Sequence, residues 1–393
     1  MMRRQAEVVV IAATRTPIGR VGGSLRTVPL ECLAARTIQA ALSAVQLPGN
    51  EVNAVILGNV IGPGGNIARL ALLEAGLPVE VPGYTVDMQC GSGLQAIVLA
   101  AQSILTGQTR CVLAGGAESC SRAPWRIEKP EDMYRGLPRV YGRARFSPAH
   151  LGDPDMGVAA ENVARRYGIP REAQDAFALS SHQKAVKAEE DGFFDALRVA
   201  VTTPTGEIVR HDDCPRPDTS LEQLRALPPV FVEGGTVTAG NACPINDGAS
   251  ICLLTTASFA RELGVRTALK YIDSTLVGVD PNVLGIGPVP AIRTLLERTG
   301  YRLEDVDLVE INEAFAAQVL ACVEELQLPM EKLNIHGGAI ALGHPYGSSG
   351  AVLVTHLFHT MMCQSDAHLG LTALGVGGGL GIAALWEKVD LTG

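Results

Sequence analysis

Apolar runs of strand length alternate with longer segments of helical spacing along the first 120 residues. The strand-like runs are residues 7–13, 54–58, 84–88 and 110–115, and the helical segments are residues 33–47 and 93–105. This alternation is typical of a mostly parallel sheet with helices on its faces. It predicts an α/β fold for the beginning of the chain.

The middle of the chain has a different pattern. Between about residues 121 and 236, charged residues and prolines become more frequent and strand-like runs are sparse. Helices are predicted for residues 156–167 and 170–191, the second with Pro170 in its first turn, where a missing N–H group costs no hydrogen bond. We therefore interpret residues 121–248 as an inserted loop or cap domain.

The strand and helix alternation returns after residue 250. Strands are predicted at residues 251–255, 268–277, 307–311 and 369–375, and helices at 257–263, 288–299, 313–326 and 349–362. The sequence thus predicts an N-terminal half at residues 1–120, completed by about residues 249–268, and a C-terminal half at residues 269–393.

Two glycine-rich turns indicate an internal repeat. Residues 90–93 and 346–350 each open a helix, and a glycine-rich strand end follows 22 residues after the first turn and 25 after the second. Repeated supersecondary units of this kind predict two similar βαβ-based halves that face each other.

Composition and charge narrow the class of protein. The 393 residues are 47% hydrophobic and 19% charged, which argues for a large buried core spread over two or three domains. A net charge of −9 without a basic run argues against nucleic-acid or membrane partners. The uncharged stretches 333–365 and 369–386 are broken by glycines, so they predict buried elements rather than membrane spans.

The nine cysteines form no CxxC pair, and their number is odd. This usage indicates a reduced, cytoplasmic protein without a disulfide framework or a zinc site. His356 and His359 lie three residues apart on a predicted helix, and no carboxylate or cysteine at a supporting offset completes a metal site. We therefore interpret both histidines as packing residues.

Cys90 and His344 are the two candidates for nucleophilic chemistry. Cys90 follows a strand and precedes a helix, where free N–H groups and the helix dipole favour a thiolate. His344 is held between Gly343 and Pro345 in a loop, which suits a general base for a distant thiol. The alternatives are a buried structural cysteine and a loop histidine held by hydrogen bonds.

Two further segments carry weaker signals. Asn312 stands where a strand meets a helix, so it is either an N-cap or an amide that holds a water or a carbonyl oxygen. The glycines of residues 375–381 expose N–H groups that stabilise an oxyanion, bind phosphate or simply allow a turn.

Taken together and in order, these segments resemble the thiolase family, which includes acetyl-CoA acetyltransferases and 3-ketoacyl-CoA thiolases. The matching stretches are residues 15–20, 87–94, 115–119, 160–162, 174–178, 238–241, 246–248, 312–315 and 337–350. The resemblance spans nearly the whole chain. It implies a layered αβαβα core and assembly as a homodimer or homotetramer. It also implies an enzyme of fatty acid metabolism that acts on acyl-CoA and has no permanently bound cofactor.

The resemblance also implies roles for individual residues. Cys90 would carry the acyl group as a thioester and His344 would activate its thiol. The N–H groups of Cys90 and Gly377 would form one oxyanion hole, and His344 with a water held by Asn312 would form the other. The residues matching the family's coenzyme A tunnel are Met156, Ala239, Cys243, Ile245, Ala314 and Phe315.

Several residues depart from the family pattern. Gly375 stands where the family has a second catalytic cysteine, which moves the α-proton. Cys243 replaces a usual serine, Asp155 a usual histidine and His336 a usual asparagine. We therefore expect an altered α-proton step, which is slow unless Cys243 or His336 reaches the proton.

Two other functions remain open at this point. One is a β-ketoacyl synthase-like decarboxylating condensation, which needs no α-proton base. The other is a coenzyme A-binding subunit with little turnover.

Overall fold

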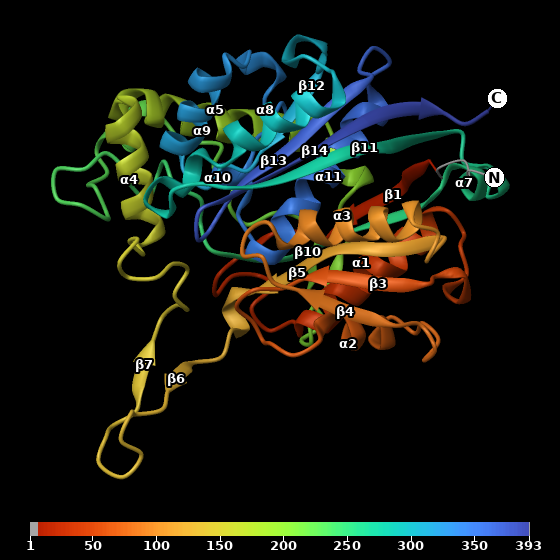
Figure 1. Ribbon diagram of the computed structural model, residues 1–393, viewed down its shortest axis with the longest axis horizontal. Coiled ribbons are helices and arrows are strands. Elements are labelled where there is room, and N and C mark those ends of the chain that lie inside the picture. Colours follow the sequence, from red (N-terminus) through yellow and green to blue (C-terminus); the bar gives the residue numbers. More distant parts are fainter. Residues whose placement is uncertain (1–6, 393) are drawn as a thin grey trace.

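The structure is a computed structural model that describes residues 7–392, and its framework is a continuous sheet (Figure 1). The strands of the N-terminal half are β1 (Val8–Arg15), β2 (Gly19–Arg20), β3 (Ala54–Gly58), β4 (Gly83–Val86), β5 (Cys111–Ser119) and β10 (Asn246–Thr256). Those of the C-terminal half are β11 (Thr267–Gly278), β12 (Leu308–Ile311), β13 (Leu369–Val376) and β14 (Leu380–Asp390). The order across the sheet is β12-β13-β14-β11-β1-β10-β5-β3-β4, with β2 paired to β10.

The two halves repeat one strand topology. In the first half β3 runs parallel to β5, which is antiparallel to β10, which is antiparallel to β1. In the second half β12, β13, β14 and β11 repeat the same three relations. The halves join where β1 pairs with β11 over only two residue pairs. The predicted pair of similar halves is therefore confirmed.

Helices form three layers around the two half-sheets. Helices α3 (Ser92–Leu105) and α11 (Tyr346–Cys363) pack against each other in a core that also contains residues of both halves. Helices α1 (Leu30–Ala44) and α2 (Ile67–Glu74) cover the outer face of the first half, and α8 (Pro288–Thr299) and α9 (Ala316–Leu326) cover that of the second. This is the expected αβαβα order of layers.

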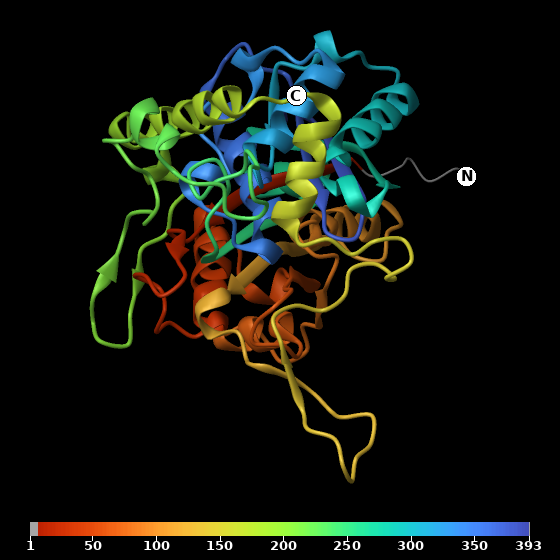
Figure 2. The same ribbon diagram turned by 90° about the vertical axis from the view of Figure 1, so that its left-hand side faces the viewer.

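The segment between β5 and β10 has two parts. A hairpin of β6 (Arg126–Glu128) and β7 (Arg139–Tyr141) projects away from the body in both views (Figures 1 and 2). The remainder contains α4 (Met156–Tyr167), α5 (Arg171–Glu190), the short strands β8 (Val201–Thr202) and β9 (Ile208–Val209), and α6 (Leu221–Arg225). Helices α4 and α5 pack on α9, and α5 also contacts α10 (Ala339–Leu342), so this part covers the C-terminal half.

Among the described residues, no helix is both long and apolar enough to cross a membrane.

Some predicted boundaries are wrong for physical reasons. Helix α9 begins at Ala316 rather than at residue 313, because Phe315 keeps extended backbone angles. Strand β5 continues through Gly115 and Gly116 to Ser119, although glycines were read as its end. Helix α2 and strand β14 were not predicted, and α7 (Ala257–Glu262) ends one residue early.

Glycines permit the close approach of α11 to α3 and β5. A Cβ atom on Gly93 would lie 2.7 Å from the carbonyl oxygen of Gly347, and one on Gly116 would overlap that same oxygen. A Cβ atom on Gly350 would overlap the backbone of Leu94. Side chains at these places would push apart the helices that carry the turns of the predicted repeat.

We predict that Gly116→Ala destabilises the fold, because the new methyl group meets rigid backbone rather than a flexible side chain. Overpacking of this kind costs about 1–3 kcal/mol of unfolding free energy. Urea denaturation followed by circular dichroism measures the loss. Gly278→Ala is the matched control, since a Cβ atom there meets nothing within 4 Å. Equal stability of the two variants would contradict the close-approach argument.

Candidate active site

The turns just before α3 and α11 carry the two reactive side chains. Cys90 directly precedes Gly91, the N-cap of α3, and His344 directly precedes Pro345, the N-cap of α11. Because α3 leads to β5 and α11 leads to β13, the two side chains occupy corresponding places in the two halves. Both line one cavity of about 240 Å³.

A tight turn presents Cys90. Gln89 has a φ of 48°, in the left-handed region that costs energy for a residue with a side chain. The turn is closed by bonds from Gly91 N–H to the Met88 carbonyl (3.1 Å) and from Ser92 N–H to the Gln89 carbonyl (3.0 Å). The Ser92 hydroxyl also accepts the Met88 N–H at 2.8 Å. The strained backbone is therefore fixed on both sides of the cysteine.

The thiol of Cys90 is poorly ionised when considered alone. Desolvation by burial raises its pKa to about 12, although the backbone N–H groups of Gly377 and of Cys90 itself oppose the rise. A thiol with this pKa needs a neighbouring base to become a nucleophile at neutral pH.

His344 has the properties of such a base. Its Nδ1 lies 2.6 Å from the Ser349 hydroxyl, and its backbone N–H donates to Asn246 Oδ1 at 2.8 Å. Its Nε2 is buried without a partner in the described chain. Burial lowers the pKa of His344 to about 4, so the ring is neutral at pH 7 and Nε2 is free to accept a proton when Nδ1 carries the hydrogen.

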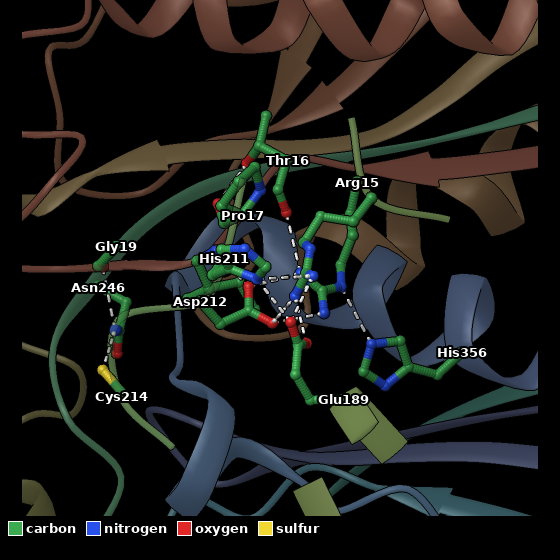
Figure 3. A network of polar contacts seen from close by, with 12 residues as sticks. Arg15, Thr16, Pro17, Gly19, Glu189, His211, Asp212, Cys214, Asn246 and His356 are labelled. Atoms are coloured by element: carbon green, nitrogen blue, oxygen red, sulfur yellow. Dashed lines mark hydrogen bonds and ion pairs between the residues drawn. The ribbon is translucent and has the colours of Figure 1, made fainter. Parts of the chain in front are cut away.

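A polar network supports the segment that holds His344 (Figure 3). Asn246, which accepts the His344 N–H, donates to the Gly19 carbonyl at 3.0 Å and to Cys214 Sγ at 3.3 Å. Two residues before Cys214, Asp212 forms a bidentate pair with fully buried Arg15 at 2.7 and 2.8 Å. Arg15 Nε also donates to His356 on α11 at 3.1 Å. The network therefore ties β1, the 212–214 loop and α11 together.

Glu118 attaches the start of α11 to the N-terminal half. Its carboxylate accepts backbone N–H groups from Gly347 at 3.0 Å and from Val60, Ile61 and Gly62 at 3.0–3.2 Å. Desolvation nevertheless raises the pKa of Glu118 to about 7. Residues 115–119 stand out in the sequence only as a stretch that matches the family, and this role of Glu118 was not predicted. The sequence feature that could have indicated this role is a carboxylate near the end of a buried strand.

Most of the predicted site residues line the cavity with Cys90 and His344. They are Met156, Cys243, Ile245, Ala314, Phe315, Gly375 and Gly377. Residues that sequence analysis did not single out complete its walls: Gly157, Ala160, Phe231, Ala242, Pro244, Leu284, Gly285, Gln318 and Tyr346. The amide oxygen of Gln318 is buried without a partner in the described chain, and no motif pointed to it.

Three residues lie elsewhere. Ala239 lines a neighbouring cavity of about 160 Å³, which shares Ala242 and Pro244 with the first. Asn312 and Ser349 line a small cavity of about 20 Å³, and the Asn312 amide nitrogen has no partner in the described chain. His336 is stacked on Phe193, with ring centroids 3.6 Å apart, and does not line the Cys90 cavity.

His356 and His359 pack as expected, against Arg15 and against the Ala13 carbonyl at 2.8 Å. Within residues 7–392, no cluster of three or more histidine, cysteine, aspartate or glutamate side chains has the geometry to hold a metal ion.

Comparisons with known proteins agree on one family. The model of the thiolase N-terminal domain matches residues 8–258, and that of the thiolase C-terminal domain matches residues 265–388. VraB of Staphylococcus aureus, provisionally named an acetyl-CoA C-acetyltransferase, is 44% identical over 97% of this chain and 99% of its own. The VraB protein of Staphylococcus haemolyticus is 43% identical over the same shares. The crystal structure of the Bacillus anthracis acetyl-CoA acetyltransferase superposes with a TM-score of 0.92 and 40% identity, over 98% of this chain and 99% of that one.

We predict that His344→Ala changes how Cys90 alkylation depends on pH. With neutral His344 as base, the rate of iodoacetamide labelling should vary little between pH 5.5 and 8, above the lowered pKa of His344. Without the base, the rate should follow the thiolate fraction and rise about tenfold per pH unit, because the pKa of Cys90 is raised. Labelling is measured by mass spectrometry of the peptide containing Cys90.

His150→Ala is the control, since that histidine is exposed. A flat profile in His344→Ala would contradict the pairing of the two side chains.

Proposed function

Because the chain belongs to the thiolase family, we propose that it works through an acyl thioester on Cys90. It is an acyltransferase of the acetyl-CoA C-acetyltransferase type. The observation that carries this proposal is that Cys90 and the unpartnered Nε2 atom of His344 belong to the lining of one cavity. Acetyl-CoA is the proposed acyl donor, and no resident cofactor takes part.

In the first half-reaction, His344 Nε2 takes the proton of the Cys90 thiol. The sulfur attacks the thioester carbonyl, the bond from that carbonyl to coenzyme A sulfur breaks, and the proton passes from His344 to the leaving thiolate. Burial supports this use of His344, because a neutral ring accepts the proton and a desolvated thiolate is strongly nucleophilic.

Backbone donors support stabilisation of the tetrahedral intermediate. The backbone N–H groups of Gly377 and Cys90 both oppose the rise in the Cys90 pKa, so we propose that they hold the oxyanion formed beside the sulfur. We propose a second oxyanion site from His344 and a water held by Asn312. The small cavity beside Asn312 has room for one water, and its unpartnered amide nitrogen supports that role.

Two adjoining cavities support coenzyme A as the carrier. The walls of the Cys90 cavity include Met156, Phe231 and Phe315, which suit the apolar parts of pantetheine and a short acyl group. The neighbouring cavity contains Ala239 with Arg20 and Arg216. We propose that these arginines meet phosphate groups of coenzyme A, despite the negative net charge of the chain.

The α-proton step is proposed to differ from that of other thiolases. Gly375 lines the cavity but offers no acid or base. Acid–base help at such a step is typically worth about 10²–10⁴-fold. We therefore expect carbon–carbon bond formation or cleavage to be slower than acyl transfer, even where another group supplies part of this help.

We predict that intact-protein mass spectrometry after mixing with acetyl-CoA finds one acetyl adduct, which Cys90→Ala abolishes. Adduct formation should be complete well before one turnover of acetoacetyl-CoA thiolysis. Gly375→Cys should raise the thiolysis rate about tenfold or more and leave the acetylation rate within about twofold. A Cβ atom at Gly375 would lie 3.2–3.3 Å from backbone atoms of Leu284 and Gly285, so a small shift accommodates it.

Other outcomes would favour the alternatives. Absence of an adduct would favour a coenzyme A-binding subunit with little turnover. Condensation that requires malonyl-CoA and releases carbon dioxide would favour the β-ketoacyl synthase-like reaction.

We also propose a homodimer or homotetramer in a reducing, cytoplasmic setting. All nine cysteines are free thiols, which supports the setting. The β6–β7 hairpin carries Trp125, Tyr134 and Leu137 at 88, 98 and 88% exposure. An isolated two-stranded hairpin is at best marginally stable, so its apolar side chains are proposed to pack on another copy of the chain.

We predict that the double variant Tyr134→Ser, Leu137→Ser lowers the oligomer size by at least half. Light scattering coupled to size exclusion measures the mass against multiples of 41.3 kDa. Val230→Ser, at a 56% exposed site outside the hairpin, is the control. An unchanged mass in the double variant would rule out the hairpin as an assembly element.

A further inference from the structure

Cleavage of a 3-ketoacyl thioester leaves a carbanion that must receive a proton, and the cavity offers few groups for this. Among the described residues that line it, those with titratable side chains are Cys90, Cys243, His344 and Tyr346. Cys90 carries the acyl group and His344 serves its thiol. Cys243 and Tyr346 therefore remain for the α-carbon.

We propose that Cys243 is the acid–base group for the α-carbon, in place of the missing side chain at residue 375. This inference rests on the proposed acyl-enzyme function. It selects Cys243 over His336, the other replacement group that the sequence suggests, because Cys243 lines the cavity and His336 does not.

Backbone contacts hold Cys243 beside the reacting groups. Its N–H donates to the Ala314 carbonyl at 3.0 Å, and the preceding Ala242 forms a β-bridge with Phe315. Two residues further on, Ile245 forms a β-bridge with His344 itself. Pro244 restricts the backbone between these contacts. The Cys243 loop is thus fixed to both the cavity wall and the segment of the general base.

The protonation state of Cys243 suits an acid. Burial raises the pKa of its thiol, and repulsion from a thiolate at Cys90 raises it further. Cys243 is therefore a neutral thiol at rest and holds a proton to give. A carbanion is a much stronger base than a thiolate, so the transfer is downhill.

Tyr346 is the less suitable group. Its ring lies edge-on to that of His344, with centroids 5.1 Å apart. Burial raises the pKa of its phenol, starting from an already higher ordinary value than that of a thiol. The phenol therefore ionises less readily than a thiol, and the tyrosinate needed to remove the α-proton in the reverse direction is scarcer.

The proton balance closes over one thiolysis cycle. Cys90, deprotonated by His344, attacks the 3-carbonyl, and the bond between the α-carbon and that carbonyl breaks. The α-carbon takes the Cys243 proton and acetyl-CoA leaves. Incoming coenzyme A then gives its thiol proton to the Cys243 thiolate and attacks the acyl carbonyl. The bond from Cys90 sulfur breaks, and Cys90 recovers its proton from His344.

The test measures deuterium incorporation into the methyl group of acetyl-CoA in D₂O, by NMR, next to acetoacetyl-CoA thiolysis. Cys243→Ala and Cys243→Ser should both lower exchange and the thiolysis kcat by about 10²-fold or more, with a much smaller change in KM. The acetyl adduct on Cys90 should still form in both. Gly375→Cys placed in the Cys243→Ala background should restore exchange. Cys363→Ala, at an exposed site, is the control.

The Cys243→Ser variant distinguishes a catalytic role of Cys243 from a binding role. A serine hydroxyl can contact pantetheine as the thiol would, but it is a far weaker acid than a thiol. Exchange near the unmodified rate in Cys243→Ser would overturn the proposal in favour of a contact role. Loss of exchange in Tyr346→Phe with retention in Cys243→Ala would transfer the role to Tyr346. An adduct without any exchange in the unmodified protein would overturn this inference alone. Absence of the adduct would overturn the proposed function as well.

Discussion

The structure depends on a backbone contact that only glycine allows. The carbonyl oxygen of Gly347 lies too close to Gly93 and Gly116 for either to carry a Cβ atom, so α11 rests directly on α3 and β5. Because a reactive residue stands just before the N-cap of each helix, this contact brings the turn of Cys90 and the loop of His344 to one cavity. The two halves supply one side chain each, and neither half holds the pair alone.

Burial shifts the pKa values of Cys90 and His344 in opposite directions. It raises the pKa of Cys90 and lowers that of His344, so the neutral pair is the resting state. Ionisation of the thiol is therefore coupled to proton transfer within the pair rather than to the solvent. The bond between Nδ1 and Ser349 orients the His344 ring, and the bond from the His344 backbone N–H to Asn246 holds its main chain, so little reorganisation is needed when charge appears.

The sequence could predict the layered α/β fold and its repeat, because strand and helix periodicity and glycine-rich turns are local signals. Cys90 and His344 were identifiable for the same reason, since each stands in a distinctive turn. Ala239 was expected in the tunnel but lines the neighbouring cavity, and the loop after it forms the boundary between the two cavities. Glu118 and Gln318 were not identified, because their roles arise from contacts with elements distant in sequence. Gly115 and Gly116 were read as a strand end, since a sequence does not reveal the neighbour that a missing side chain accommodates.

The pairing of β1 with β10 has a consequence for synthesis of the chain. Val8 lies opposite Thr256, so the first strand cannot find its central partner until about 250 residues have left the ribosome. At a translation speed of 5–20 residues per second, that delay lasts roughly 12–50 seconds. During this time β1 and β5 both present unpaired edges, and long-range pairings of this kind also fold slowly. The nascent N-terminal half is therefore a natural client for chaperones that shield exposed strands.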